Sequence, residues 1–278
     1  MEAGLYIVPT PIGNLADITQ RCLEVLGSVD VVAAEDTRHS RKLLHHYGID
    51  TAMIAYHEHS KEQDTHSLVE RIDAGDAVAL ISDAGTPLVS DPGYRLVRAV
   101  QDAGLPVVPM PGPCAAIVAL SASGLPTDRF LFDGFLPSKA TQRRSRFGEL
   151  LDSSATLVFY EAPHRILETL EDAVTVFGGH REAVLARELT KTFETVKRLP
   201  LADLLRWVAE DPNQQRGEQV LLIAAAERGS AVLTAETRRL LERLGDELPP
   251  RKAAAIVADI SGLKARDLYD VLLSVKEG

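Results

Sequence analysis

The stretch Ile81-Ser82-Asp83-Ala84-Gly85-Thr86-Pro87-Leu88-Val89-Ser90-Asp91-Pro92-Gly93 decides the fold. It follows a short apolar run, 77–81, and precedes a helical pattern over 94–103. A short apolar run followed by a helix is typical of a buried parallel strand. Glycine allows close backbone approach and proline stiffens the turn. We therefore predict a rigid loop at the carboxyl end of a strand, where open α/β sheets bind ligands. An ordinary turn rich in Gly and Pro is the alternative.

Three further loops of this kind, 9–15, 35–38 and 111–114, follow predicted strands in the first 120 residues. Strand and helix alternate five times there, which predicts a mainly parallel sheet with helices on both faces. Since the carboxyl ends of parallel strands share one edge, we expect the four loops to converge. The first loop has no GxGxxG and no Walker lysine, so it does not indicate the nucleotide sites built on those motifs.

Acidic residues stand at two predicted helix starts. Asp17 is the expected cap of a helix that begins near Ile18. Of Glu35 and Asp36, one is expected to cap the helix 40–47 and the other to belong to the site.

The second half of the chain also alternates, with strands predicted over 130–135, 156–160, 183–186, 192–198 and 219–224. Hairpin connections among them indicate a mixed sheet. We therefore predict two α/β domains, 1–119 with a mainly parallel sheet and 120–228 with a mixed sheet, followed by a helical tail, 229–278. In the tail, helix, Gly-containing turn and helix resemble a helix-turn-helix, but a plain packing module has the same pattern and is favoured.

The composition bounds the class of protein. The chain has 278 residues, of which 45% are hydrophobic, so it can bury a sizeable core. Its net charge of −10 argues against a non-specific nucleic-acid binder. Cys22 and Cys114 are its only cysteines, which predicts two reduced thiols in a cytoplasmic protein. No apolar run approaches the roughly 20 residues of a membrane span, and no signal peptide is expected.

Two motifs have competing interpretations. The basic residues Lys139, Arg143, Arg144 and Arg146 have no acid between them, which is typical of a solvated helix face and also of a nucleic-acid contact. His57-Glu58-His59 resembles metal-ligand spacing, but adjacent residues of a strand point to opposite faces. We therefore predict no metal site.

Seven motifs in order resemble one family. They are Thr10-Pro11-Ile12-Gly13-Asn14-Leu15, Ala34-Glu35-Asp36-Thr37-Arg38, Ser82-Asp83-Ala84-Gly85-Thr86-Pro87, Pro111-Gly112-Pro113, Phe159-Tyr160-Glu161-Ala162-Pro163-His164-Arg165, Ala186-Arg187-Glu188-Leu189-Thr190-Lys191 and Gly217-Glu218. Together they are similar to the bacterial ribosomal RNA small-subunit 2′-O-methyltransferases of the tetrapyrrole-methylase fold. The resemblance covers Leu5 to about Ala225, and the tail resembles the helical extension of that family.

The resemblance implies two α/β domains with S-adenosylmethionine bound in the cleft between them, and a homodimer. The implied target is the ribose hydroxyl of a cytidine in the decoding region of small-subunit ribosomal RNA, free or in the assembled subunit. Such a donor needs apolar walls, backbone groups and some negative potential near its sulfur, which Asp83 would help to supply. The expected cofactor-binding residues are Pro11, Gly13, Asp83, Ala84, Gly85, Pro87, Pro111, Gly112, Tyr160 and Leu189.

Methyl transfer to a hydroxyl is helped by a base and by cations that stabilise developing charge. The candidate catalytic residues are Glu35, Asp36, Glu161, Glu188 and Lys191. Arg187 is a further cation near the expected cleft, and the expected RNA-binding residues are Arg38, Lys139, Arg143, Arg144 and Arg165. For each of these side chains the alternative is a helix cap or an ion pair.

Two other functions compete with this one. The same fold could methylate a tetrapyrrole or another small molecule, although the basic segments and the tail argue against so small a substrate. A non-catalytic ribosome-associated binding protein is the other alternative, which would have no affinity for the methyl donor.

Overall fold

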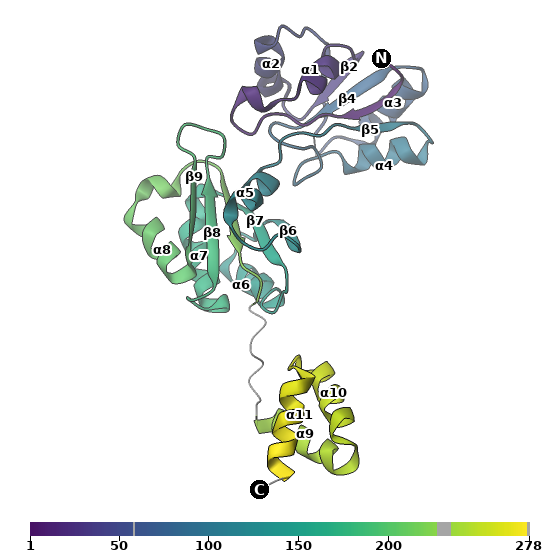
Figure 1. Cartoon of the computed structure of the whole chain (residues 1–278). Coiled ribbons are helices and arrows are strands. Elements are labelled where there is room, and N and C mark those ends of the chain that lie inside the picture. The colour runs from purple at the N-terminus through teal and green to yellow at the C-terminus, as the bar shows by residue number, and fades with distance from the viewer. Residues whose placement is uncertain (58, 227–234, 277–278) are drawn as a thin grey trace. The chain divides into compact units, whose positions relative to one another are not determined.

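The structure is a computed structural model that describes residues 1–57, 59–226 and 235–276. The chain divides into two compact units, Met1–Ala225 and Ala226–Gly278. The first unit contains two five-stranded sheets, and the described residues of the second form three helices (Figure 1). In the described part of the chain, no helix is long and apolar enough to cross a membrane.

The first sheet is entirely parallel, with the order β3-β2-β4-β1-β5. Its strands are β1 (Gly4–Ile7), β2 (Val31–Ala34), β3 (Met53–Ala55), β4 (Ala77–Ile81) and β5 (Val107–Pro109). The central strand β4 is buried along its whole length. Ala79 and Ile81 belong to the core on one face, and Val78 and Leu80 to the core on the other. The unbroken apolar run 77–81 is therefore a strand covered on both faces.

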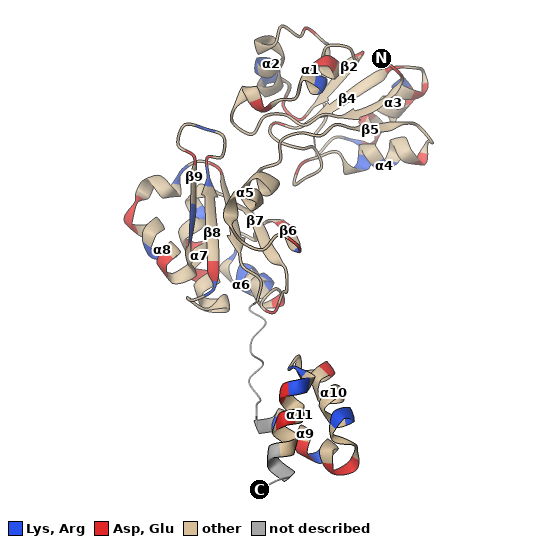
Figure 2. Cartoon of the chain, viewed as in Figure 1, with Lys and Arg blue, Asp and Glu red and all other residues tan. Residues whose placement is uncertain are grey.

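Helices cover both faces of this sheet, as predicted. α1 (Gln20–Leu26) and α2 (Thr37–His46) pack on one face, and α3 (Glu62–Asp73) and α4 (Tyr94–Asp102) on the other. Figure 2 shows the charged residues on the helices, while the strands of this sheet carry none.

The caps of the first two helices differ from the expectation at one position. Asp36 caps α2, so one of the two acids after β2 serves the helix, as expected. Asp17 does not cap α1: Thr19 does, through a hydrogen bond from Cys22 N to Thr19 Oγ1. Thr19 directly precedes the helix, whereas Asp17 lies in the preceding 3-10 turn, Leu15–Asp17.

The second sheet is mixed, as predicted, with the order β6-β7-β10-β8-β9. Its strands are β6 (Phe130–Phe135), β7 (Thr156–Glu161), β8 (Glu182–Arg187), β9 (Thr195–Pro200) and β10 (Gln219–Ile223). Only β6 and β7 pair in parallel. One face carries α6 (Ala140–Glu149), α7 (Ile166–Phe177) and α8 (Leu201–Glu210), and the other carries α5 (Ala115–Ser123).

The helix α5 belongs to the second sheet. Its Ala116, Ala119 and Leu120 pack with Val158 and Val220 of that sheet. The predicted boundary between residues 119 and 120 therefore falls inside a helix, and the second half begins before α5.

The second unit is a three-helix module of α9 (Ala235–Glu247), α10 (Pro250–Ser261) and α11 (Ala265–Lys276). Its small core consists of Leu241, Ala253, Ala254, Val257, Leu268 and Leu272. Gly262 ends α10 with a φ of 71°, a left-handed conformation that favours glycine. The predicted turn at 261–264 is thus present, while residues 229–234 and 277–278 of the predicted tail lie outside the described residues.

Candidate active site

The four strand-end loops of the first half are joined by hydrogen bonds. Thr10 and Gly85 exchange two backbone bonds, of 2.9 and 3.0 Å, and Thr10 Oγ1 donates to Ser82 O at 3.1 Å. Thr86 Oγ1 donates to Pro113 O at 2.8 Å. Asp36 N donates to Asp83 Oδ1 at 3.1 Å, which joins the remaining loop to this group. The predicted convergence of the loops is therefore confirmed.

The two acids after β2 have different surroundings. Asp36 Oδ1 accepts hydrogen bonds from Arg38 N at 2.8 Å and from His39 N at 3.4 Å. The bond from Arg38 N lowers the pKa of Asp36. Glu35 Oε2 instead accepts from Asp83 N at 3.4 Å. Asp36 is thus engaged by the start of α2, and Glu35 lies beside Asp83.

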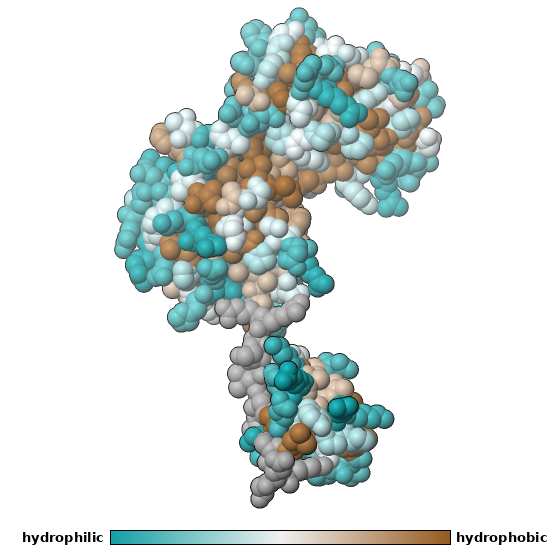
Figure 3. Space-filling view, viewed as in Figure 1, coloured by the Kyte–Doolittle hydropathy of each residue, from teal (hydrophilic) through white to brown (hydrophobic). Residues whose placement is uncertain are grey.

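A cavity of about 370 Å³ lies where the loops of the two halves meet. This volume is within the range of small-ligand sites, about 300–1,000 Å³. Its walls are mostly apolar, and Figure 3 shows an apolar surface in the region of α5. The first half contributes Ile12, Ala84, Gly85, Thr86, Val89, Ser90 and Asp91, and the second contributes Ala115, Phe135, Tyr160, Glu161, Ala162, Pro163, Leu189, Glu218, Gln219 and Val220.

The expected cofactor-binding residues fall into three groups. Ala84, Gly85, Tyr160 and Leu189 line the cavity. Pro11 and Asp83 line a neighbouring hollow of about 50 Å³. Pro87, Pro111, Gly13 and Gly112 line neither space.

Gly13 and Gly112 lie at close packing contacts. A Cβ on Gly13 would stand 2.5 Å from Lys191 Cγ, and one on Gly112 would stand 2.5 Å from Pro9 Cβ. Both positions therefore exclude a side chain because neighbouring residues occupy the space.

Asp91 is a cavity-lining carboxyl that was not among the predicted site residues. Burial raises the pKa of Asp91 from 3.8 to about 6. A hydrogen bond with Ser82 opposes this rise, and the nearby carboxylates Glu35 and Asp83 add to it. The sequence signal for this residue was its place in the loop already predicted to bind a ligand.

Tyr160 anchors an aromatic group at the cavity. Its hydroxyl accepts a hydrogen bond from Ala116 N at 3.2 Å, and burial raises the pKa of Tyr160. Its ring meets Phe132 and Phe135 edge to face, with ring centroids 4.9 and 5.5 Å apart. Phe135 also lines the cavity, although the sequence predicts it only as the end of a strand.

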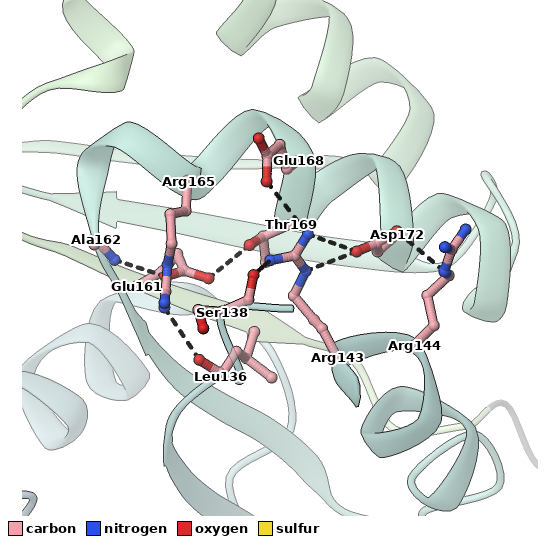
Figure 4. A network of polar contacts seen from close by, with 10 residues as sticks. All are labelled: Leu136, Ser138, Arg143, Arg144, Glu161, Ala162, Arg165, Glu168, Thr169 and Asp172. Carbon is pink, nitrogen blue, oxygen red and sulfur yellow. Dashed lines mark hydrogen bonds and ion pairs between the residues drawn. The ribbon is translucent and has the colours of Figure 1, made fainter. Parts of the chain in front are cut away.

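Glu161 lines the cavity, and its side chain is fully buried in a polar network (Figure 4). Its carboxylate accepts hydrogen bonds from Ala162 N at 2.7 Å, Thr169 Oγ1 at 2.6 Å and the Arg165 guanidinium. Arg165 Nη2 also donates to Leu136 O at 3.1 Å. These contacts hold the turn after β7 and the segment after β6, so both side chains are engaged within the protein.

Arg143 continues this network, and it is not the surface residue that an RNA contact requires. Its side chain is 1% exposed and pairs with Asp172, with Nε and Nη2 each 2.7 Å from Oδ2. Arg143 Nη1 donates to Ser138 O at 3.4 Å. The expected RNA-binding role of Arg143 is therefore wrong, because α6 turns this position toward α7.

Other expected RNA contacts do lie on the surface. The side chain of Arg144 is 47% exposed and that of Arg38 is 91% exposed. Lys139, which directly precedes α6, is also exposed. The basic segment thus divides between core and solvent, a division that charge counting alone does not reveal.

The turn after β8 forms an ion-paired rim. Lys191 Nζ lies 2.9 Å from Glu188 Oε1 and 3.0 Å from Glu218 Oε2, and Glu218 N donates to Glu188 Oε1 at 3.0 Å. Burial alone would raise the pKa of Glu188, but the hydrogen bonds from Lys191 and Glu218 N lower it. Arg187 is buried below this rim, where Nη2 donates to Phe193 O at 3.0 Å.

Four non-glycine residues in the described chain have a left-handed backbone: Leu88, Ser90, Glu188 and Thr190. They belong to two loops, one from each half, and both loops line the cavity. Such conformations are strained and cluster at functional sites. Their positions therefore indicate the same cavity as the lining residues do.

The structure offers no candidate metal site among the residues it describes, where no group of three or more His, Cys, Asp or Glu is arranged to hold an ion. Glu58, the middle residue of the histidine motif, lies outside the described residues. Cys22 and Cys114 are both free thiols.

Comparisons with known proteins agree with this architecture. The family model described as Tetrapyrrole (Corrin/Porphyrin) Methylases matches residues 4–205, and the model described as RsmI C-terminal HTH domain matches 231–276. The second match favours the helix-turn-helix alternative for the tail over the plain packing module.

Curated relatives match along almost the whole chain. A protein of Pseudomonas aeruginosa is 56% identical, over 98% of this chain and 98% of its own. One of Vibrio cholerae is also 56% identical, over 95% and 92%. Both are named Ribosomal RNA small subunit methyltransferase I.

Solved structures show the same fold at low identity. A diphthine synthase has a TM-score of 0.59 at 17% identity, covering 80% of this chain and 89% of its own. A uroporphyrin-III C-methyltransferase from Thermus thermophilus, complexed with S-adenyl homocysteine, has a TM-score of 0.54 at 17% identity, covering 80% and 97%. The chain therefore belongs to the tetrapyrrole (corrin/porphyrin) methylase family.

Proposed function

We propose that this chain transfers a methyl group to the 2′-oxygen of a cytidine ribose in small-subunit ribosomal RNA. It is an S-adenosylmethionine-dependent methyltransferase, and its 56% identical relatives are named for small-subunit ribosomal RNA. The observation that carries the proposal is the apolar cavity between the two halves, with Asp91 in its wall.

The cavity has the chemistry that the methyl donor needs. Ala84, Gly85 and Leu189 offer close backbone and apolar walls for the adenosyl group. Asp91, with Glu35 and Asp83 near it, places negative potential where a sulfonium would be favoured. A bound cation would in turn favour the ionised form of Asp91.

The reaction is an in-line displacement. The 2′-oxygen forms a bond to the methyl carbon, the carbon–sulfur bond breaks, and S-adenosylhomocysteine leaves. Because sulfonium is a good leaving group, positioning of the two reactants supplies much of the rate. The hydroxyl proton passes to a carboxylate, for which a pKa near the working pH is suitable.

Asp91 is the carboxylate that we assign to this step. The two other carboxylates that line the cavity are engaged, Glu161 by Arg165 and Thr169, and Glu218 by Lys191. Of the bases proposed from the sequence, Asp36 caps α2 and Glu188 is paired with Lys191, while Glu35 remains the second candidate beside Asp83.

The test uses small ribosomal subunits and naked ribosomal RNA from cells that lack this gene. Wild-type protein with labelled donor should add one ribose methyl group, which mass spectrometry of RNA fragments would locate. Asp91→Asn should slow single-turnover transfer by about 10²–10⁴-fold while calorimetry shows S-adenosylhomocysteine still bound. Absence of RNA methylation by the wild type would refute the function. Full activity of Asp91→Asn would refute only the assignment of the base.

The resemblance also supports a cytoplasmic homodimer that acts on ribosomal RNA, either free or in the assembled subunit. Light scattering would measure its mass in solution. The rates of methylation on assembled subunits and on naked RNA would show which of the two is the substrate.

A further inference from the structure

Phe135 stands at the boundary between the cavity and the open surface. It lines the cavity, yet 59% of the residue is exposed. A cavity of about 370 Å³ lies near the lower end of the range that holds one small ligand. If the methyl donor fills it, as the proposed function requires, the second reactant must approach from outside, past exposed lining residues such as Phe135.

Two guanidinium groups, that of the buried Arg143 and that of Arg165, whose side chain is 19% exposed, hold the backbone that follows this ring (Figure 4). Arg165 donates to Leu136 O at 3.1 Å, and Arg143 donates to Ser138 O at 3.4 Å. Each arginine is in turn paired with a buried carboxylate, Glu161 or Asp172 (Figure 4). The segment after β6 is thus fixed from inside the protein by charges that look, in the sequence, like surface residues.

The Phe135 ring is itself positioned from one side. It packs edge to face with Tyr160, whose hydroxyl is held by Ala116 N. A ring fixed by its neighbours loses little conformational entropy when a partner binds. Phe135 is therefore a preorganised aromatic surface at the edge of the cavity.

We propose that Phe135 stacks on a base of the ribosomal RNA at the mouth of the cavity, and that the exposed Lys139 contacts a neighbouring phosphate. This inference rests on the proposed function. Sequence-specific RNA recognition relies on unpaired bases that stack on aromatic side chains. Lys139 follows Phe135 by four residues. The segment between them contains Leu136 and Ser138, whose carbonyls accept the hydrogen bonds from Arg165 and Arg143. Arg143 and Arg165 are then positioning residues rather than RNA contacts.

Phe135→Leu removes the ring and keeps an apolar side chain, and Phe135→Tyr keeps the ring. Phe130→Leu is the matched control, since Phe130 is a 44% exposed aromatic at the opposite end of the same strand. Methylation of small ribosomal subunits from cells lacking the gene gives kcat/KM for RNA. Calorimetry gives the affinity for S-adenosylhomocysteine, and a melting temperature checks the fold.

We expect Phe135→Leu to lower kcat/KM for RNA by about 5- to 150-fold, the range for loss of one base–aromatic stack. The affinity for S-adenosylhomocysteine should not change, and Phe135→Tyr and Phe130→Leu should match the wild type. Lys139→Ala should lower kcat/KM for RNA by a smaller factor, and this loss should disappear at high salt.

Two results would overturn the inference while the proposed function stands. One is a Phe135→Leu variant whose kcat/KM equals that of the wild type. The other is a loss of S-adenosylhomocysteine affinity that accounts for the whole loss in rate, because the ring would then belong to the donor site. A wild-type protein that methylates no RNA is a different outcome, which refutes the proposed function first.

Discussion

The two halves of the first unit build their sides of the cavity by different means. In the first half, backbone groups, hydroxyls and the Asp83 carboxylate join the loops, as in the paired bonds between Thr10 and Gly85. In the second half, ion pairs hold the strand ends, as the buried Glu161 does with Arg165. Two similar cavity walls can therefore have very different sequence patterns. Loops rich in Gly and Pro are recognised from composition, whereas a buried ion pair resembles two surface charges.

The largest effect is expected where the second half depends on charge. Arg143→Ala leaves Asp172, whose side chain is 10% exposed, without its close partner. Breaking a buried pair in this way should lower the free energy of unfolding by about 3–5 kcal/mol. Denaturant titration would measure it.

Arg144→Ala is the matched control at the next position. The Arg144 side chain is 47% exposed, with Nε 3.5 Å from Asp172 Oδ1, so its loss should lower the free energy of unfolding by under about 1 kcal/mol. Equal losses of unfolding free energy in the two variants would contradict the conclusion that Arg143 belongs to the core and Arg144 to the surface.

The first half should respond to loss of a hydroxyl rather than of a charge. Thr10→Val removes the hydrogen bond to Ser82 O, and Thr10 is 2% exposed. Because the buried carbonyl of Ser82 then lacks this donor, the free energy of unfolding should fall by about 1–3 kcal/mol. Thr10→Ser restores the hydroxyl and should recover most of the stability in the same denaturant titration. Failure of Thr10→Ser to recover it would mean that the methyl group, not the bond, matters.

Stability should depend on pH through Asp91, the acid that the first half places in the cavity. Its pKa rises from 3.8 to about 6 on folding, so the folded state binds the proton more tightly than the unfolded state. Ionisation therefore destabilises the fold as pH rises through this window. Asp91→Asn should stabilise the protein at pH 7.5 by about 1 kcal/mol, since solvent screens part of the effect. This gain in the free energy of unfolding should vanish near pH 4. A gain that does not depend on pH would contradict the raised pKa of Asp91.

The smallest effect concerns exposed cations of the two halves. If Arg38 and Arg144 each contact one phosphate, replacing either with Ala should reduce the slope of log affinity against log salt by about 0.7–0.9. Filter binding of ribosomal RNA at several salt concentrations would measure it. Exposed Arg206, on α8, is a control whose replacement should leave the slope unchanged.

The fold was largely predictable because its periodic signals are strong. The apolar run 77–81 became the central strand, and the breaker-rich loops after the strands met as expected. The boundary at α5 was misplaced because its Ala-rich sequence does not reveal which sheet it covers. The cap of α1 is Thr19 rather than the predicted Asp17, since Asp and Thr can both cap a helix and only the backbone shows which residue directly precedes it.

The site was less predictable, since burial is set by tertiary contacts. Arg143 and Arg144 are adjacent and chemically identical, yet one is enclosed by α7 and the other is half exposed. Asp91 and Phe135 gain their place in the cavity wall from residues far away in the sequence, such as Tyr160. No local pattern distinguishes such residues from their neighbours.

The left-handed backbone at Leu88, Ser90, Glu188 and Thr190 bears on how this protein can evolve. Each such residue carries about 1–2 kcal/mol of steric penalty that glycine would not have. Replacing Ser90 with glycine should therefore raise the melting temperature slightly while it loosens one wall of the cavity. Selection for heat resistance and selection for turnover would then act in opposite directions on the same four positions, and organisms living at different temperatures should resolve that conflict differently.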